Sequence, residues 1–135
     1  MKRDLASQMI PPDSSSNAVA AEFFMTLLHA ATTGHILHLQ TRSYAQHKAL
    51  DEFYSELPGL VDSVIEAYQG KYGLITEYPN GYNMPSGAAL DVVSGLSDYV
   101  MSTRANVASD SEIQNLIDGI QELIDSTIYK LRFLA

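Results

Sequence analysis

The chain has 135 residues, no cysteine, and a formal charge of −8 from 16 acidic and 8 basic residues. The absence of cysteine excludes disulfides, thiolate metal sites and thiol catalysis. The basic residues are scattered along the sequence, so we expect no basic face for counterion release and no DNA binding. The length fits one domain, and the sequence contains no apolar run typical of a signal peptide or a membrane span. We therefore expect a soluble, cytoplasmic protein.

Residues 1–15 contain two adjacent prolines and a serine run, which predicts an irregular N-terminal arm. Asp13 or one of the serines would cap the helix that follows. Apolar residues then recur with helical periodicity and predict a first helix from about 16 to 40. Gly34 weakens the interior of this helix by about 1 kcal/mol, so we expect a packing reason for it. His29 falls in the apolar stripe, where core packing is expected.

A second helix follows the corner that ends at Ser43, which is a suitable N-cap residue. Its apolar positions continue to Gly70. Pro58 lies inside it, where proline removes a backbone hydrogen bond, so we expect a kink. The alternative is a new helix that begins at Pro58. Residues 71–85 are rich in glycine, proline, asparagine and tyrosine, which predicts a long crossover connection.

Two further helices complete the pattern. Ser86 is expected to cap a helix at about 87–104, and Ser109 or Ser111 to start the last helix. The buried stripe of the last helix is expected at positions 113, 116, 117, 120, 123, 124, 128 and 131. Four amphipathic helices with a long central connection predict an all-α protein, a ferritin-like four-helix bundle over residues 16–135 with a crossover between its second and third helices.

Histidines and acidic residues recur at helical spacing around the first corner. His35 lies near the end of the first helix, and His47 begins a run in which acidic residues follow at intervals of four, eleven and four. The acidic residues of this run are Asp51, Asp62 and Glu66. Because eleven residues make about three helical turns, His47 and the three acids share roughly one stripe of the second helix. Each pair taken alone is more typical of a solvated helix face.

Imidazole combined with carboxylates is a ligand set suited to iron, manganese or zinc. His38 lies one turn beyond His35, and spacing alone does not decide which of the two would be the ligand. The candidate metal ligands are His35, His38, His47, Asp51, Asp62 and Glu66. Asp62 and Glu66 stack like charges one turn apart, an arrangement that a bound dication would relieve.

The stretch HILHLQTRSYAQHKALDEFYSELPGLVDSVIEAYQG resembles the corresponding two-helix segment of Dps, the mini-ferritin family of starved cells. The metal signature of that family is His, eleven residues, His, three, Asp, ten, Asp, three, Glu. The chain reproduces it without a gap as His35, His47, Asp51, Asp62 and Glu66. The segment is also similar to small ferritin-like proteins carried by tailed phages.

The resemblance implies a ferroxidase that forms a dodecameric shell. Its di-iron sites would lie at two-fold interfaces, with histidines from one chain and carboxylates from the other. Asp51, Asp62 and Glu66 would then be the catalytic carboxylates, and hydrogen peroxide or oxygen the oxidant of Fe²⁺. If the chain is phage-encoded, the compartment would be the host cytoplasm.

The chain departs from the family at two points. Ile36 stands where Dps proteins carry tryptophan after the first histidine, and the lysine-rich DNA-binding tail is missing. The DNA-compacting role is therefore not carried over. An alternative function from another class remains open: a catalytically inactive ferritin-like module used in phage assembly or attached to the virion.

Overall fold

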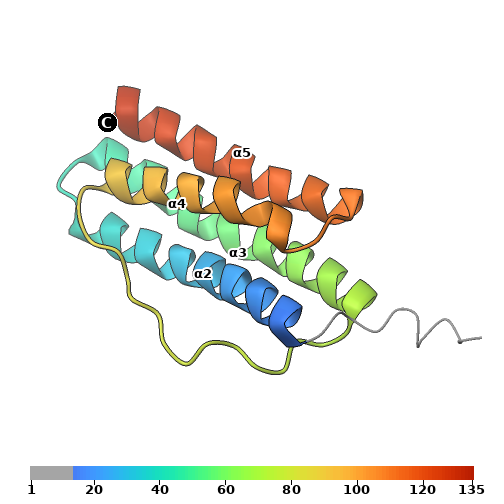
Figure 1. The fold of residues 1–135 in the computed structure, drawn as a ribbon. Helices are drawn as coiled ribbons and strands as arrows, with labels where there is room; N and C mark the ends of the chain where they lie inside the picture. Colours follow the sequence, from blue (N-terminus) through green and yellow to red (C-terminus); the bar gives the residue numbers. More distant parts are fainter. Residues whose placement is uncertain (1–13) are drawn as a thin grey trace, which may run out of the picture.

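The computed structural model describes residues 14–135. This part of the chain contains four α-helices, one short 3₁₀ helix and no strand, which confirms the all-α class (Figure 1). The elements are α2 (Ser14–Gln40), α3 (Tyr44–Tyr72), α4 (Ala89–Thr103), η1 (Arg104–Asn106) and α5 (Ser111–Phe133). The predicted cap at Asp13 lies outside the described residues, as does most of the predicted arm.

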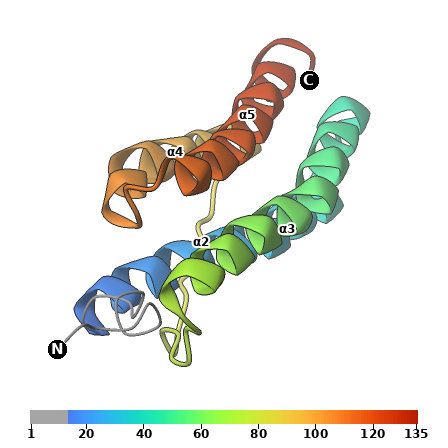
Figure 2. The same cartoon turned by 90° about the vertical axis from the view of Figure 1, so that its right-hand side faces the viewer.

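The helices form two antiparallel hairpins, α2 with α3 and α4 with α5 (Figures 1 and 2). Residues 73–88 run along the bundle from the end of α3 to the opposite end of the molecule, so α3 and α4 run in the same direction. The hairpins pack together mainly through α3 and α5, whereas α2 and α4 make few contacts. No helix in the described part has both the length and the hydropathy of a membrane span.

Two local features shape the α2–α3 hairpin: the N-cap of α3 at Ser43 and the glycine at position 34. Ser43 accepts a hydrogen bond from the backbone N–H of Gln46, as its N-cap role predicts. Helix α3 then runs without interruption through Pro58, so a separate helix does not begin there. A Cβ added at Gly34 would lie 2.8 Å from Cδ2 of Phe53. The expected packing reason for Gly34 is therefore the close approach of α2 to α3.

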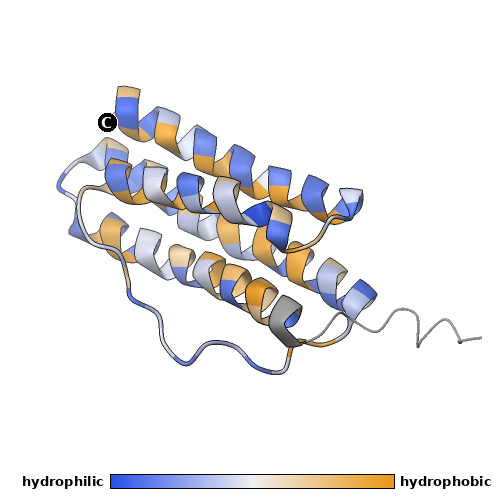
Figure 3. Cartoon of the chain, viewed as in Figure 1, coloured by the Kyte–Doolittle hydropathy of each residue, from blue (hydrophilic) through white to orange (hydrophobic). Residues whose placement is uncertain are grey.

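Helix α5 supplies the most regular apolar face of the core. Most positions of its predicted stripe are buried, from Ile113 to Leu131. Leu116 is an exception because it is 37% exposed, and Thr127 is buried instead, with its hydroxyl donating to the carbonyl of Leu123 at 2.8 Å. Hydrophilic residues recur along the outer side of α5 in Figure 3. Helix α5 is amphipathic as predicted, but its buried face is rotated slightly about the helix axis, toward Thr127 and away from Leu116.

The start of α4 differs from the sequence prediction, whereas α5 begins at Ser111, one of its two predicted starts. Helix α4 begins at Ala89 with Ala88 as its N-cap, not at 87 with Ser86. The reason is Gly87, whose φ of 124° is incompatible with a right-handed helix. Helix α5 begins at Ser111, but its N-cap residue is Asp110, which makes no side-chain cap bond. The Asp110 carboxylate instead accepts a hydrogen bond from Tyr72 and forms an ion pair with Lys71 at 2.7 Å.

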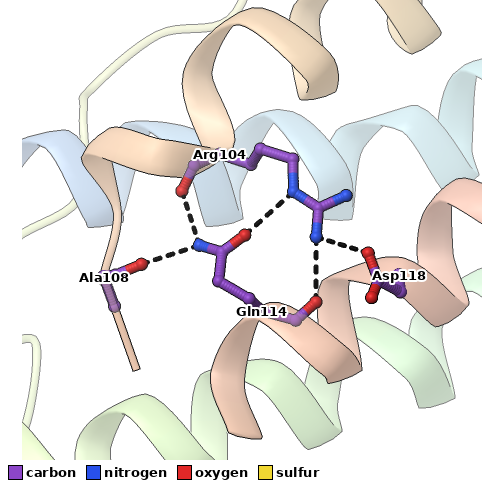
Figure 4. A network of polar contacts seen from close by, with 4 residues as sticks. All are labelled: Arg104, Ala108, Gln114 and Asp118. Atoms are coloured by element: carbon purple, nitrogen blue, oxygen red, sulfur yellow. Dashed lines mark hydrogen bonds and ion pairs between the residues drawn. The ribbon is translucent and has the colours of Figure 1, made fainter. Parts of the chain in front are cut away.

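A polar network joins η1 to α5 (Figure 4). The Arg104 guanidinium donates to the side-chain oxygen and to the carbonyl oxygen of Gln114, both at 2.9 Å, and to Asp118 at 2.5 Å. The Gln114 amide returns hydrogen bonds to the carbonyls of Arg104 and Ala108. This network fixes the second hairpin, since the Gln114 side chain ties both the first residue of η1 and the loop after η1 to α5.

Candidate metal centre

The corner between α2 and α3 brings two of the predicted ligands into direct contact. The imidazole rings of His38 and His47 are stacked, with centroids 3.6 Å apart and planes inclined by 19°. Nδ1 of His38 lies 2.7 Å from the carbonyl oxygen of His47, and Nδ1 of His47 lies 2.9 Å from the carbonyl oxygen of His38. The two residues are therefore held by a reciprocal pair of hydrogen bonds across the corner.

These hydrogen bonds define the tautomer of both rings. A carbonyl oxygen can only accept, so each Nδ1 must carry the proton. The remaining nitrogen, Nε2, then presents a lone pair when the ring is neutral. A backbone carbonyl that fixes one imidazole nitrogen while the other stays available is the usual support of a metal-binding histidine. The stacked rings have nearly parallel planes, so their lone pairs do not converge on one ion.

His38 and His47 differ in exposure. The His38 side chain is buried, with 8% of the residue exposed, whereas His47 is half-buried. Of these two histidines, His47 is therefore the better candidate ligand, because a metal ion can reach it from solvent. The buried position of His38 favours a structural role. Between the two histidines that the sequence left open, His35 and His38, exposure favours His35.

His35 is exposed and rests on an aromatic ring from the other helix. Its centroid lies 4.1 Å from that of Tyr54, with an angle of 5° between the planes. Within residues 14–135 its ring nitrogens make no hydrogen bond to protein, so both stay available. Hydrogen bonding to the half-buried Asp51 carboxylate raises the pKa of the Tyr54 hydroxyl above its ordinary value. Asp51 precedes Tyr54 by three residues and so lies on the same side of α3 as the His35–Tyr54 stack.

The remaining two acids lie farther along α3. Asp62 and Glu66 are exposed, one turn apart, and form no ion pair within the described residues. They do not meet the histidines of their own chain. Within residues 14–135, no three His, Asp or Glu side chains of a single chain are grouped so that they could hold one metal ion. The six-residue ligand set stays a prediction, because an interface site draws its ligands from two chains.

Two histidine contacts were not foreseen from the sequence. Tyr54 lies two helical turns after His47 on α3, and its ring meets His35 of α2. The prediction for His29 was wrong: it is exposed, and its ring stacks on Tyr82 of the 73–88 crossover with centroids 4.4 Å apart. The apolar stripe is wide on α2, so periodicity did not distinguish its edge from its centre.

A pocket of about 410 Å³ lies between α2, α4 and the crossover, with Phe53 of α3 also in its wall. Apolar and aromatic residues such as Leu37, Phe53 and Tyr99 form much of its wall, and its only charged lining residue within the described part of the chain is Asp91. None of the six predicted ligands lines it. The pocket is therefore separate from the candidate metal centre.

Comparison with known proteins places the chain in a family. A model described as "Family of unknown function (DUF5856)" matches residues 38–131. The chain belongs to the DUF5856 family. It is also similar to the "Uncharacterized 14.6 kDa protein in mobD-ri intergenic region" of Enterobacteria phage T4, with 42% identity over 122 residues, 87% of this chain and 91% of that protein. No solved structure matches the chain.

The DUF5856 match begins at His38 and so contains both residues of the imidazole stack. It also contains Tyr54 and all three predicted acidic ligands. His35 lies three residues before the matched segment.

Proposed function

We propose that this protein binds Fe²⁺ between two copies of the chain and oxidises it, as a ferritin-like iron-sequestering protein. The observation that carries the proposal is the orientation of His47, whose Nδ1–H is fixed on the His38 carbonyl while Nε2 has no hydrogen-bond partner within residues 14–135. Asp51 lies one turn away on the same helix, and His35 is exposed on the adjacent one. This arrangement would form half of a metal site, and Asp62 and Glu66 of a second chain would supply the other half.

The surface of α2 supports a site shared by two chains. From residue 23 to residue 40, α2 carries no Asp, Glu, Lys or Arg. Leu28 and Leu39 are 39% and 68% exposed. Thr32 and His35 are exposed between them at spacings of three and four. An uncharged helix face beside an exposed histidine fits contact with another protein surface. A second copy seated there would bring its own α3 carboxylates toward the histidines.

The topology supports the ferritin-like part of the proposal. Ferritin-like bundles have one long crossover connection between otherwise short corners. Here the corners span residues 41–43 and 107–110, and the crossover spans 73–88. The crossover places α3 and α4 parallel, as a ferritin-like arrangement requires (Figure 1).

The proposed chemistry treats iron as the substrate. Two Fe²⁺ ions each give up one electron, and hydrogen peroxide takes both electrons and two protons to form two molecules of water. With oxygen as the oxidant, the same two electrons and two protons give hydrogen peroxide. Carboxylates favour the harder Fe³⁺ over Fe²⁺, so Asp51, Asp62 and Glu66 would bind the oxidised product more strongly than the substrate. The same ligand set would also accept Mn²⁺ or Zn²⁺.

Anaerobic Fe²⁺ titration followed by addition of peroxide tests this function. We expect the wild-type protein to bind Fe²⁺ and to accelerate its oxidation, and Glu66→Ala to lose most of both effects. Glu56→Ala is the matched control, because Glu56 is an exposed glutamate of α3 outside the predicted set. Native mass spectrometry of the same samples should show a closed oligomer. The proposal is wrong if the wild type neither binds Fe²⁺ nor changes its oxidation rate.

A second function, a metal-free interaction module in phage assembly or on the virion, is favoured by the phage T4 relative. In this case the exposed apolar residues of α2 would contact another phage protein, and the acids of α3 would be solvated. Metal analysis of untreated protein together with its native mass separates the two functions. A closed, iron-containing shell supports the ferroxidase, and a smaller metal-free species supports the module.

A further inference from the structure

The Tyr54 ring contacts two of the candidate ligand histidines. It stacks on His35 with centroids 4.1 Å apart and meets the edge of His38 at 5.2 Å, with planes inclined by 61°. The tyrosine comes from α3 and both histidines from α2, so a single side chain contacts two imidazoles of the neighbouring helix. A Cβ added at Gly34 would lie 3.5 Å from Cβ of Tyr54, which shows how closely the helices approach here.

We propose that Tyr54 is the positioning residue of the metal site and holds the His35 imidazole in the orientation that binds Fe²⁺. This inference rests on the proposed function. An exposed histidine ordinarily samples several rotamers and loses that freedom when it binds a metal. The stack orders the ring beforehand, so less conformational entropy is lost on binding.

The stack should also strengthen when the metal binds. A cation coordinated by an imidazole withdraws electron density from the ring and makes it partly positive. The face of a tyrosine ring carries negative charge density and attracts such a group. Tyr54 would therefore stabilise the metal-bound form of His35 more than the free form, and this difference raises affinity.

Two replacements of Tyr54 distinguish the effect of its aromatic ring face on Fe²⁺ binding from the effect of apolar packing. Tyr54→Phe keeps the face and removes the hydroxyl, whereas Tyr54→Leu keeps an apolar side chain and removes the face. Tyr129→Leu is the matched control, because Tyr129 is a 54% exposed tyrosine of α5 whose aromatic contact is Phe133. Each protein is titrated anaerobically with Fe²⁺ by calorimetry, and the His35 ring signals of the metal-free protein are recorded by NMR.

We expect Tyr54→Phe and the control to bind Fe²⁺ within about twofold of wild type, and Tyr54→Leu to bind about tenfold more weakly, as for other residues that orient metal ligands. The His35 ring protons should show an upfield ring-current shift in wild type and Tyr54→Phe that is lost in Tyr54→Leu. The ring-current shift reports the Tyr54 face over the His35 ring directly, so it distinguishes the stack from a general contribution of Tyr54 to packing.

Equal Fe²⁺ affinity in wild type and Tyr54→Leu would overturn the positioning role while leaving the proposed function intact. Equal weakening by Phe and Leu would also overturn it, because the hydroxyl rather than the ring face would then be responsible. A wild-type protein that binds no Fe²⁺ overturns both the function and the positioning role, even if the NMR shift is present.

Discussion

His38 and His47 face each other across the α2–α3 corner, and each donates its Nδ1–H to the carbonyl oxygen of the other. The contact joins the last turn of α2 to the first turn of α3, and it gives a hydrogen-bond partner to the His38 carbonyl, one of the last four carbonyls of its helix. The pair therefore fixes the corner and, with it, the position from which His35 and His47 would reach a metal.

Replacing His38 by phenylalanine should separate stability from metal binding. The substitution keeps a stacked ring but removes the donor to the His47 carbonyl, so the free energy of unfolding in urea should fall by about 1 kcal/mol. Fe²⁺ affinity should change little, because His38 is buried. His35→Phe should do the reverse and lose Fe²⁺ affinity with a stability change below about 0.5 kcal/mol. If His38→Phe loses the metal at unchanged stability, His38 is the ligand.

Gly34→Ala should destabilise the bundle by about 1–2 kcal/mol in urea unfolding. The added methyl group would overlap the buried Phe53 ring, and the cost of overpacking exceeds the gain in helix propensity. Gly59→Ala is the control, because nothing lies within 4 Å of a Cβ at that position of α3. The control should be neutral or slightly stabilising, and a destabilised control would show that the loss at Gly34 is not specific to the contact.

The Tyr72–Asp110 contact predicts a dependence of stability on alkaline pH. Hydrogen bonding to the Asp110 carboxylate is the main cause that raises the pKa of Tyr72 from 10.0 to about 12. The stabilisation is therefore fully present below pH 10.0 and is lost as pH rises to about 12. The test compares the urea unfolding midpoints of wild type and Tyr72→Phe at each pH. The titration of the other tyrosines affects both proteins equally and cancels in the difference. The advantage of wild type should shrink between these two pH values, and a constant difference would contradict the contact.

The Asp110 carboxylate should also make the stability of the protein depend on acid pH. Lys71 and Tyr72 lower the pKa of Asp110 below its ordinary value of 3.8. Its stabilisation is present above that ordinary value and is lost as pH falls through the lowered pKa. The test compares the free energy of unfolding of wild type and Asp110→Asn as pH falls. Wild type should lose more stability in acid than the variant, because the variant has no carboxylate at position 110 to protonate. An identical acid profile for the variant and wild type would exclude this role.

Arg104→Lys should destabilise the second hairpin by about 1–3 kcal/mol, because an ammonium cannot reproduce the fork that binds Gln114 (Figure 4). Asp118→Asn should cost less than about 1 kcal/mol, since the Asp118 side chain is 62% exposed and its ion pair is largely solvated. Thermal unfolding of both variants tests the order. A larger loss for Asp118→Asn would mean that the ion pair, rather than the amide contact, holds η1.

The sequence predicted a helix correctly where a short-range feature, such as an N-cap residue or the spacing of apolar residues, determines it. Ser43 caps α3 because its hydroxyl reaches the N–H of Gln46, three residues away. The stripe from Ile113 to Leu131 identifies α5, since the spacing of apolar residues determines which face is buried. At the start of α4 the serine rule failed, because the positive φ of Gly87 depends on how the crossover enters the helix.

The candidate site was less predictable because it depends on contacts between helices. Spacing identified His47 and Asp51 as neighbours on one helix, but the stack with His38 requires the geometry of the corner. Tyr54 meets His35 across two helices that approach closely where Gly34 faces Phe53, and spacing along one helix does not show such a contact. Whether Asp62 meets a histidine depends on how two chains associate, and no pattern within one sequence determines that.

The crossover of residues 73–88 has a consequence for folding kinetics. Each hairpin closes through a few residues, so its contacts are close in sequence and should form early. Docking of the two hairpins must first restrict the 73–88 segment and should therefore be the slow step of refolding. Glycine-rich extensions of that segment should slow refolding while leaving the unfolding rate nearly unchanged.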